Sequence, residues 1–84
     1  ASYRIKKMKR EILQAINLFF QEKNKETPSL DLDIFELGLI DSMELLELII
    51  YLESELDIRV DQELMTVDNF RSVSSIVKTL SIYE

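Results

Sequence analysis

Apolar residues recur every three or four positions along most of this chain, the spacing that predicts amphipathic helices. The first such stretch runs from Tyr3 to about Glu22, and lysine and arginine fall largely on its other side. Its apolar positions are Ile5, Met8, Ile12, Ala15, Ile16, Phe19 and Phe20. The pattern predicts a long first helix with a solvated basic face.

A second apolar stretch follows Asp41 and runs to about Leu56, and its start carries several helix-start signals. Asp41 can cap the free amides of the first turn, and Glu44, three residues later, can complete a capping box. Gly38 allows the chain to turn into this start. The apolar positions of the stretch are Leu45, Leu46, Leu48, Ile49, Leu52 and Leu56. So broad an apolar arc predicts the central, most buried helix of a bundle.

A long connection, residues 23–41, separates these two helices. Pro28 lacks an amide donor and ends the helical pattern. Apolar residues alternate over residues 30–35, but the chain offers no partner strand, so we interpret this segment as an ordered loop held by apolar anchors. Asp31 and Asp33 have the opening spacing of an EF-hand loop, yet its glycine and its final acidic position are not filled. Calcium binding is therefore not expected here.

The last third of the chain predicts two further helices. A loop over residues 57–65 precedes a short helical turn over residues 66–70, and a final helix capped by Ser72 extends to about Leu80. The predicted fold class is all-α, with four helices, a long loop between the first two and a short third helix. With 84 residues, we expect a single domain, residues 1–84.

The composition restricts the chemistry that this chain can perform. It contains no cysteine and no histidine, which excludes disulfides, thiolate metal sites and nucleophiles paired with histidine. Ser42 has only acidic neighbours in the sequence, and Lys78 is the one lysine after position 25. We therefore expect no catalytic residue, no metal site and no enzyme activity. No apolar run is long enough to span a bilayer and no signal peptide is recognisable, so a cytoplasmic protein without membrane insertion is expected.

The net charge of −6 comes from 16 acidic and 10 basic residues, which are unevenly placed. Most basic residues precede position 26, whereas Arg59 is the one basic residue between Glu26 and Phe70. An acidic body repels nucleic acid and attracts basic partner surfaces. A competing hypothesis is membrane or nucleic-acid binding through the first helix, by Lys6, Lys7, Lys9 and Arg10.

Ser42 stands at a position that suits a phosphate ester. It belongs to the first turn of the second helix, at the end of a long loop, where it should be exposed. Free backbone amides and the positive end of the helix dipole converge there. From this local chemistry alone, however, an ordinary polar residue in a first helical turn is the favoured interpretation.

The stretch Gly38-Leu39-Ile40-Asp41-Ser42-Met43 resembles the attachment motif of acyl carrier proteins, in which Asp-Ser is followed by Leu or Met. The order of the predicted elements matches that family over almost the whole chain. The resemblance implies a four-helix acyl-carrier-like bundle in which a phosphopantetheinyl transferase moves 4′-phosphopantetheine from coenzyme A to Ser42. Asp41 and Met43 would flank the attachment point. The terminal thiol of the arm would hold acyl or aminoacyl groups as thioesters.

The resemblance also implies how partners dock. The second helix would be the recognition helix, with Glu44, Glu47 and Glu53 as docking acids for basic surfaces. The partners would be the transferase, a loading enzyme and a downstream synthase or transferase, each meeting a monomeric carrier.

The type of carrier stays open between several pathways. The motif lacks the paired glycines of peptidyl carriers and the Gly-Ala-Asp-Ser-Leu of fatty-acid carriers. It is more similar to the D-alanyl carriers of teichoic-acid modification and to stand-alone aminoacyl or secondary-metabolite carriers. The alternative function is an unmodified acidic helical adaptor, in which the same acids dock a basic partner and Ser42 has no role.

Overall fold

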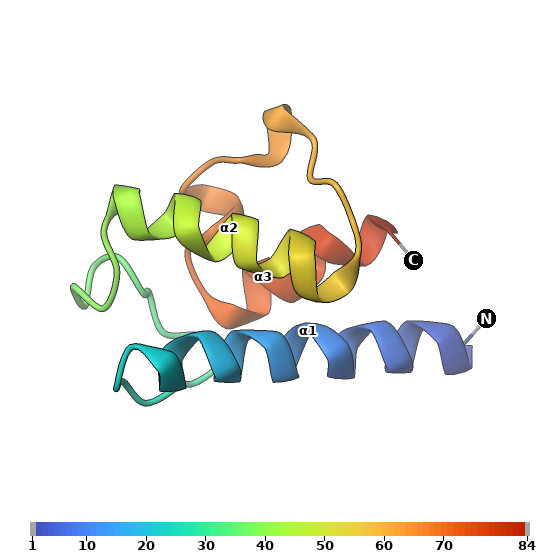
Figure 1. The fold of residues 1–84 in the computed structure, drawn as a ribbon, viewed down its shortest axis with the longest axis horizontal. Coiled ribbons are helices and arrows are strands. Elements are labelled where there is room, and N and C mark those ends of the chain that lie inside the picture. The colour runs from blue at the N-terminus through green and yellow to red at the C-terminus, as the bar shows by residue number, and fades with distance from the viewer. Residues whose placement is uncertain (1, 84) are drawn as a thin grey trace.

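The structure is a computed structural model that describes residues 2–83, with side chains from Met8 onward. Its elements are α1 (Ser2–Glu22), α2 (Ser42–Leu56), η1 (Gln62–Leu64), η2 (Asp68–Phe70), α3 (Val73–Leu80) and η3 (Ser81–Tyr83), where η denotes a 3₁₀ turn. No strand occurs between residues 2 and 83, so the predicted all-α class is confirmed (Figure 1).

Helix α1 is the element on which the rest of the molecule packs. It contacts α2, α3 and η3 and runs along the length of the molecule (Figure 1). Its inner face consists of side chains no more than 5% exposed: Ile12, Ala15, Ile16, Phe19 and Phe20. This face joins the buried residues of α2, α3 and the connections in one hydrophobic core.

The prediction that the second helix is the most buried one is wrong. The buried residues of α2 are Leu45, Leu48, Ile49 and Leu52. Leu46 is 54% exposed and Ile50 is 59% exposed, although both lie on a helix that is apolar over most of its circumference. The core covers one side of α2, Tyr51 and Leu56 are partly buried against it, and Leu46 and Ile50 face solvent.

Between residues 2 and 83, the structure contains three α-helices rather than the predicted four. The segment expected to form the short third helix contains only η2, a single 3₁₀ turn. There the Thr66 hydroxyl accepts a hydrogen bond from the Asn69 amide at 3.3 Å, and Phe70 is fully buried. A three-residue turn is enough to place one aromatic anchor in the core. The final helix begins as predicted, with Ser72 Oγ accepting from the Ser75 amide at 3.1 Å.

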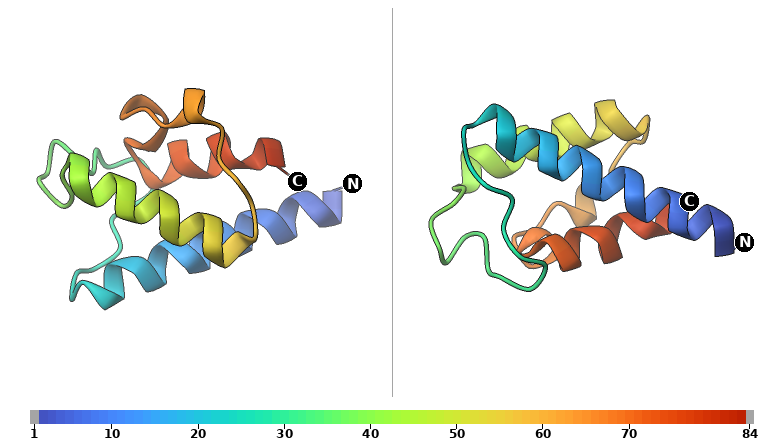
Figure 2. Two further views of the ribbon diagram at one scale, coloured as in Figure 1. Left: turned by 45° about the horizontal axis from the view of Figure 1, so that its top comes forward. Right: turned by 90° about the horizontal axis from the view of Figure 1, so that it is seen from below.

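The connection over residues 23–41 crosses the end of the molecule that lies away from the start of α1 and from η3 (Figures 1 and 2). Its anchor is Ile34, which is fully buried and whose amide donates to the Arg71 carbonyl at 2.7 Å. Leu30 and Leu32 are 52% and 45% exposed, so these two alternating apolar residues do not act as anchors. Backbone hydrogen bonds with residues at the start of α3, Ile34 to Arg71 and Ser74 to Leu30, hold the loop together with the burial of Ile34.

The basic face predicted for the first helix is described only in part. Lys9 and Arg10 are exposed, whereas the side chains of Lys6 and Lys7 lie outside the described residues. Within residues 2–83, no helix combines the length and the apolar character needed to cross a membrane.

Arg71 joins the connection to the start of α3 through two carboxylates. Its guanidinium donates to Asp33 at 2.9 Å and to Asp68 at 2.6 Å. Asp33 also accepts hydrogen bonds from the Glu36 and Phe35 amides at 2.9 Å and 3.0 Å. The hydrogen bond from the Glu36 amide, followed by the contact with Arg71, holds the pKa of Asp33 below its usual value.

We predict that Asp33→Asn reduces the loss of stability in acid. Because the pKa of Asp33 is lower in the folded than in the unfolded state, its contribution is complete above about pH 4 and disappears as the pH falls through the folded-state pKa. Urea unfolding measured from neutral pH into acid should show a less stable variant at neutral pH with a flatter acidic slope. The matched control is Asp31→Asn at an exposed position, and equal flattening there would contradict the assignment.

Candidate functional site

Ser42 is the first residue of α2, and its side chain is exposed as expected. The predicted capping box precedes it. The Asp41 carboxylate accepts from the Glu44 amide at 2.9 Å, and the Glu44 carboxylate accepts from the Asp41 amide at 3.2 Å. Of the four amides that a helix start leaves without intrahelical partners, the box occupies two, and those of Ser42 and Met43 remain.

The chain reaches this helix start through a turn that needs glycine. Gly38 has a φ of 72°, in the left-handed region that side chains with a Cβ rarely adopt. The Gly38 and Leu39 amides donate to the carbonyls of Phe35 and Ile34, both at 3.0 Å. Ile40 and Leu45, which flank the capping box, are both buried. A tight turn and two apolar anchors therefore fix the position of Ser42.

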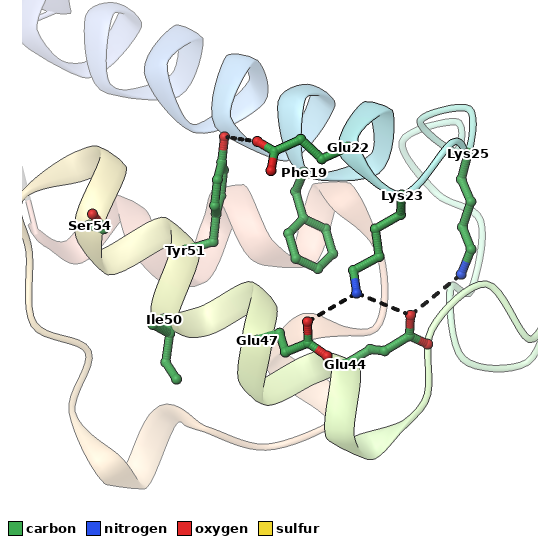
Figure 3. Close-up of a pocket in the computed structure, with 9 residues that line it drawn as sticks. All are labelled: Phe19, Glu22, Lys23, Lys25, Glu44, Glu47, Ile50, Tyr51 and Ser54. Atoms are coloured by element: carbon green, nitrogen blue, oxygen red, sulfur yellow. Dashed lines mark hydrogen bonds and ion pairs between the residues drawn. The ribbon is translucent and has the colours of Figure 1, made fainter.

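Two lysines after α1 hold the acidic side of α2 (Figure 3). Lys23 Nζ lies 3.0 Å from the Glu47 carboxylate and 3.6 Å from that of Glu44. Lys25 Nζ lies 3.6 Å from the same Glu44 oxygen and also donates to the Leu39 carbonyl. We call Lys23, Lys25, Glu44 and Glu47 the lysine clamp.

The clamp lysine Lys23 has contacts on several sides. Its ammonium also lies 5.4 Å from the centroid of the Phe19 ring. The hydrogen bond to Glu47, more than any other contact, raises the pKa of Lys23 above its usual value. The ammonium is therefore charged at neutral pH. Sequence reasoning missed both clamp lysines, although two lysines directly after a helix end, in a chain so acidic beyond them, are a signal for internal pairing.

A groove of about 740 Å³ lies between α1 and α2, with the clamp at its end nearest the start of α2 (Figure 3). Phe19 and Tyr51 are its aromatic residues, and the Tyr51 hydroxyl donates to the Glu22 carboxylate at 3.3 Å. Burial, followed by the charges of Glu55 and Glu22, raises the pKa of Tyr51, so the phenol remains a neutral donor. Ile50 and Ser54 complete the lining on the α2 side.

The third predicted docking acid, Glu53, has a structural contact. Its carboxylate accepts a hydrogen bond from the Val60 amide at 2.8 Å and so holds the loop that follows α2. This contact accounts for an acidic residue among apolar positions of the helix. A docking role for Glu53 stays a prediction.

Exposed apolar side chains occupy the side of α2 next to the groove. Met43, Leu46 and Ile50 are 76%, 54% and 59% exposed, and their spacing of three and then four residues places them along one side of the helix. We call these three residues the apolar row. The sequence interpretation assigned Leu46 to the core, although the width of the apolar arc already exceeded what one packed side can bury. Met43, predicted to flank the attachment point, is part of the row.

The site favours an anion on Ser42 but provides no means of activating its hydroxyl. Two free amides and the positive helix end lie at the residue, which suits a phosphate ester. The neighbouring carboxylates of Asp41 and Glu44 are both engaged in the capping box. Among residues 2–83, no three potential metal-ligating side chains gather in one place.

Known proteins match most of the chain. A family model described as "Phosphopantetheine attachment site" matches residues 10–80. The D-alanyl carrier protein of Streptococcus thermophilus is 35% identical over 71 residues, which cover 84% of this chain and 87% of that protein. The D-alanyl carrier proteins of Streptococcus gordonii and Streptococcus sanguinis are each 34% identical over the same shares. No solved structure matches.

We predict that Asp41→Ala lowers the free energy of unfolding by about 1 kcal/mol, because it removes the cap of α2. Asp41→Asn keeps an oxygen that can accept from the Glu44 amide, so it should retain most of the stability. Urea unfolding of the two variants measures the two free energies of unfolding. An equal loss in both would show that charge, rather than the capping hydrogen bond, matters at this position.

Proposed function

This chain belongs to the phosphopantetheine attachment family of carrier proteins, and from that premise we propose that Ser42 carries the arm and presents aminoacyl or acyl groups to partner enzymes. The family is non-catalytic, and its members hold a covalent 4′-phosphopantetheine group. The observation that carries the proposal for Ser42 is its exposure at a helix start with two free amides.

The residues around Ser42 fit a phosphodiester. The Ser42 and Met43 amides are available as donors, and the helix dipole opposes the repulsion from Asp41. When attached, the arm supplies a thiol that forms thioesters, and this chain has no cysteine of its own. Ser42 contributes the hydroxyl oxygen that becomes esterified, and Asp41 with Glu44 keeps the helix start in place.

The attachment step requires a partner enzyme. The Ser42 oxygen forms a bond to the β-phosphorus of coenzyme A, the pyrophosphate bond breaks, and adenosine 3′,5′-bisphosphate leaves with the bonding electron pair. Since both nearby carboxylates serve as caps, the proton of Ser42 goes to a base of the transferase. This step would take place in the cytoplasm, which suits a chain without cysteine.

The cargo that we propose is a small aminoacyl group, D-alanyl in particular. The relatives named D-alanyl carrier proteins support this choice, because they align with most of the chain. The packing supports it as well. The core side chains of α1, α2 and α3 include many that are 0–2% exposed, such as Leu48, Ile76 and Phe20, so a long acyl chain that entered the core would have to displace packed residues. A D-alanyl thioester needs no such space.

Partners are proposed to dock on α2 of a monomeric carrier. The apolar row offers contact area beside Ser42, and Glu44 and Glu47 offer charge to a basic surface. Glu53 would add a contact farther along the helix. The partners in this proposal are the transferase, a loading enzyme and a downstream transferase that accepts the aminoacyl group.

We predict that coenzyme A and a broad-specificity phosphopantetheinyl transferase add the mass of one arm to the wild-type protein. Ser42→Ala should show no gain, because it removes the accepting oxygen. The matched control is Ser54→Ala on the same helix, also exposed, which should be modified like the wild type. Intact mass spectrometry distinguishes these results. If the correctly folded wild-type protein gains no mass, the alternative function as an unmodified adaptor is favoured.

We predict that Leu46→Gln combined with Ile50→Gln raises the KM of the transferase for the carrier roughly tenfold and leaves kcat nearly unchanged, since two apolar docking contacts are lost. Stability should change by only about 0.5 kcal/mol per residue, because both side chains are exposed. The matched control, Leu18→Gln with Ile82→Gln, alters two exposed apolar residues elsewhere. An equal rise of KM in that control would show that the apolar row is not part of the docking surface.

A further inference from the structure

The acids expected to receive basic partners are already paired inside the molecule. Glu44 faces both clamp lysines through one oxygen, and Glu47 is hydrogen-bonded to Lys23 at 3.0 Å. The same Glu44 side chain uses its other oxygen for the capping box. A basic partner surface would therefore have to compete with cations that this chain supplies itself.

We propose that Lys23 and Lys25 are specificity-determining residues that withhold Glu44 and Glu47 from basic surfaces and select partners that dock mainly through the apolar row. This inference deepens the proposed function and rests on it. It concerns which partner surface fits α2, not whether Ser42 is modified.

The geometry explains why the lysines are effective competitors. Lys23 is held by two carboxylates and the Phe19 ring, and Lys25 is held by the Leu39 carbonyl and Glu44. A partner lysine must lose its own freedom on docking, whereas these two ammonium groups already have fixed places. They also follow α1 directly, so their local concentration near α2 is high at any partner concentration.

The strength of these ion pairs is limited because their side chains are partly exposed to solvent. The side chains of Lys23 and Lys25 are 26% and 33% exposed, and Glu47 is 58% exposed, so water and salt screen the ion pairs. Ion pairs of this type are weak enough for a partner to displace. The clamp therefore biases partner choice rather than closing the surface.

The apolar row remains free while the clamp is formed. Ile50 points away from α1 and from the clamp (Figure 3), and all three residues of the row are more than half exposed. A partner with an apolar patch and few lysines or arginines can contact the row without disturbing any ion pair. A strongly basic partner gains less binding free energy from Glu44 and Glu47 than the number of acidic residues on α2 would suggest.

The test is a double-mutant cycle read from the kinetics of arm transfer to Ser42. The first pair of changes is Lys23→Gln with Lys25→Gln, and the second is Glu44→Gln with Glu47→Gln, in which glutamine at position 44 can still complete the capping box. KM and kcat of a transferase with a basic docking surface are measured at low and high salt for wild type, both double variants and the quadruple variant. Thermal unfolding verifies that each variant is folded.

The expected result is that Lys23→Gln with Lys25→Gln lowers KM about two- to fivefold at low salt, with a steeper dependence on salt and an unchanged kcat. The glutamate changes should raise KM more in that background than in the wild type. Lys23→Arg with Lys25→Arg should restore the wild-type salt dependence. The control Lys9→Gln with Lys78→Gln makes the same change in net charge at two exposed lysines and should give a smaller effect.

The outcomes separate this inference from the proposed function. If the wild type is modified but the clamp variants show an unchanged or higher KM, or match the Lys9 and Lys78 control, the inference is overturned and Ser42 remains the attachment residue. If the folded wild type is never modified, the proposed function fails and the clamp inference fails with it. A lower KM with coupling between the two pairs supports the inference.

Discussion

The carboxylate of Glu44 is the group on which the arrangement around Ser42 depends. One of its oxygens accepts from the Asp41 amide, and the other lies 3.6 Å from the ammonium groups of both Lys23 and Lys25. A single side chain thus connects the two lysines that follow α1 with the start of α2. Because Asp41 and Glu44 make these contacts and Ser42 does not, Ser42 is fixed in place and still exposed.

The features that were predictable from the sequence are local ones. The starts of α2 and α3 follow from Asp41 and Ser72, whose capping partners lie three residues away, and the turn at Gly38 follows from its lack of a Cβ. The position of Ser42 at an exposed helix start follows from the same signals. Each of these predictions uses interactions within a single turn of chain, where spacing alone determines geometry.

The features that were not predictable depend on how segments meet. Lys23 and Glu47 are 24 positions apart, so the sequence can signal that the lysines after α1 are paired but not which acids they meet. Leu46 belongs to an apolar arc that is wider than the core can cover, so only the packing decides that it is exposed. The same holds for residues 66–70, where burial of Phe70 needs a turn and not a full helix.

The placement of α1 has a practical meaning for handling the protein. This helix has 21 residues, so its first turn lies about 30 Å from the end where α2 begins. Its first turn and η3 lie together at the far end (Figure 1). A fluorophore, a biotin or a sensor surface coupled at that far end would sit well clear of the Ser42 hydroxyl. Molecules immobilised there would keep the start of α2 at the end far from the attachment point, where a partner in solution can reach it.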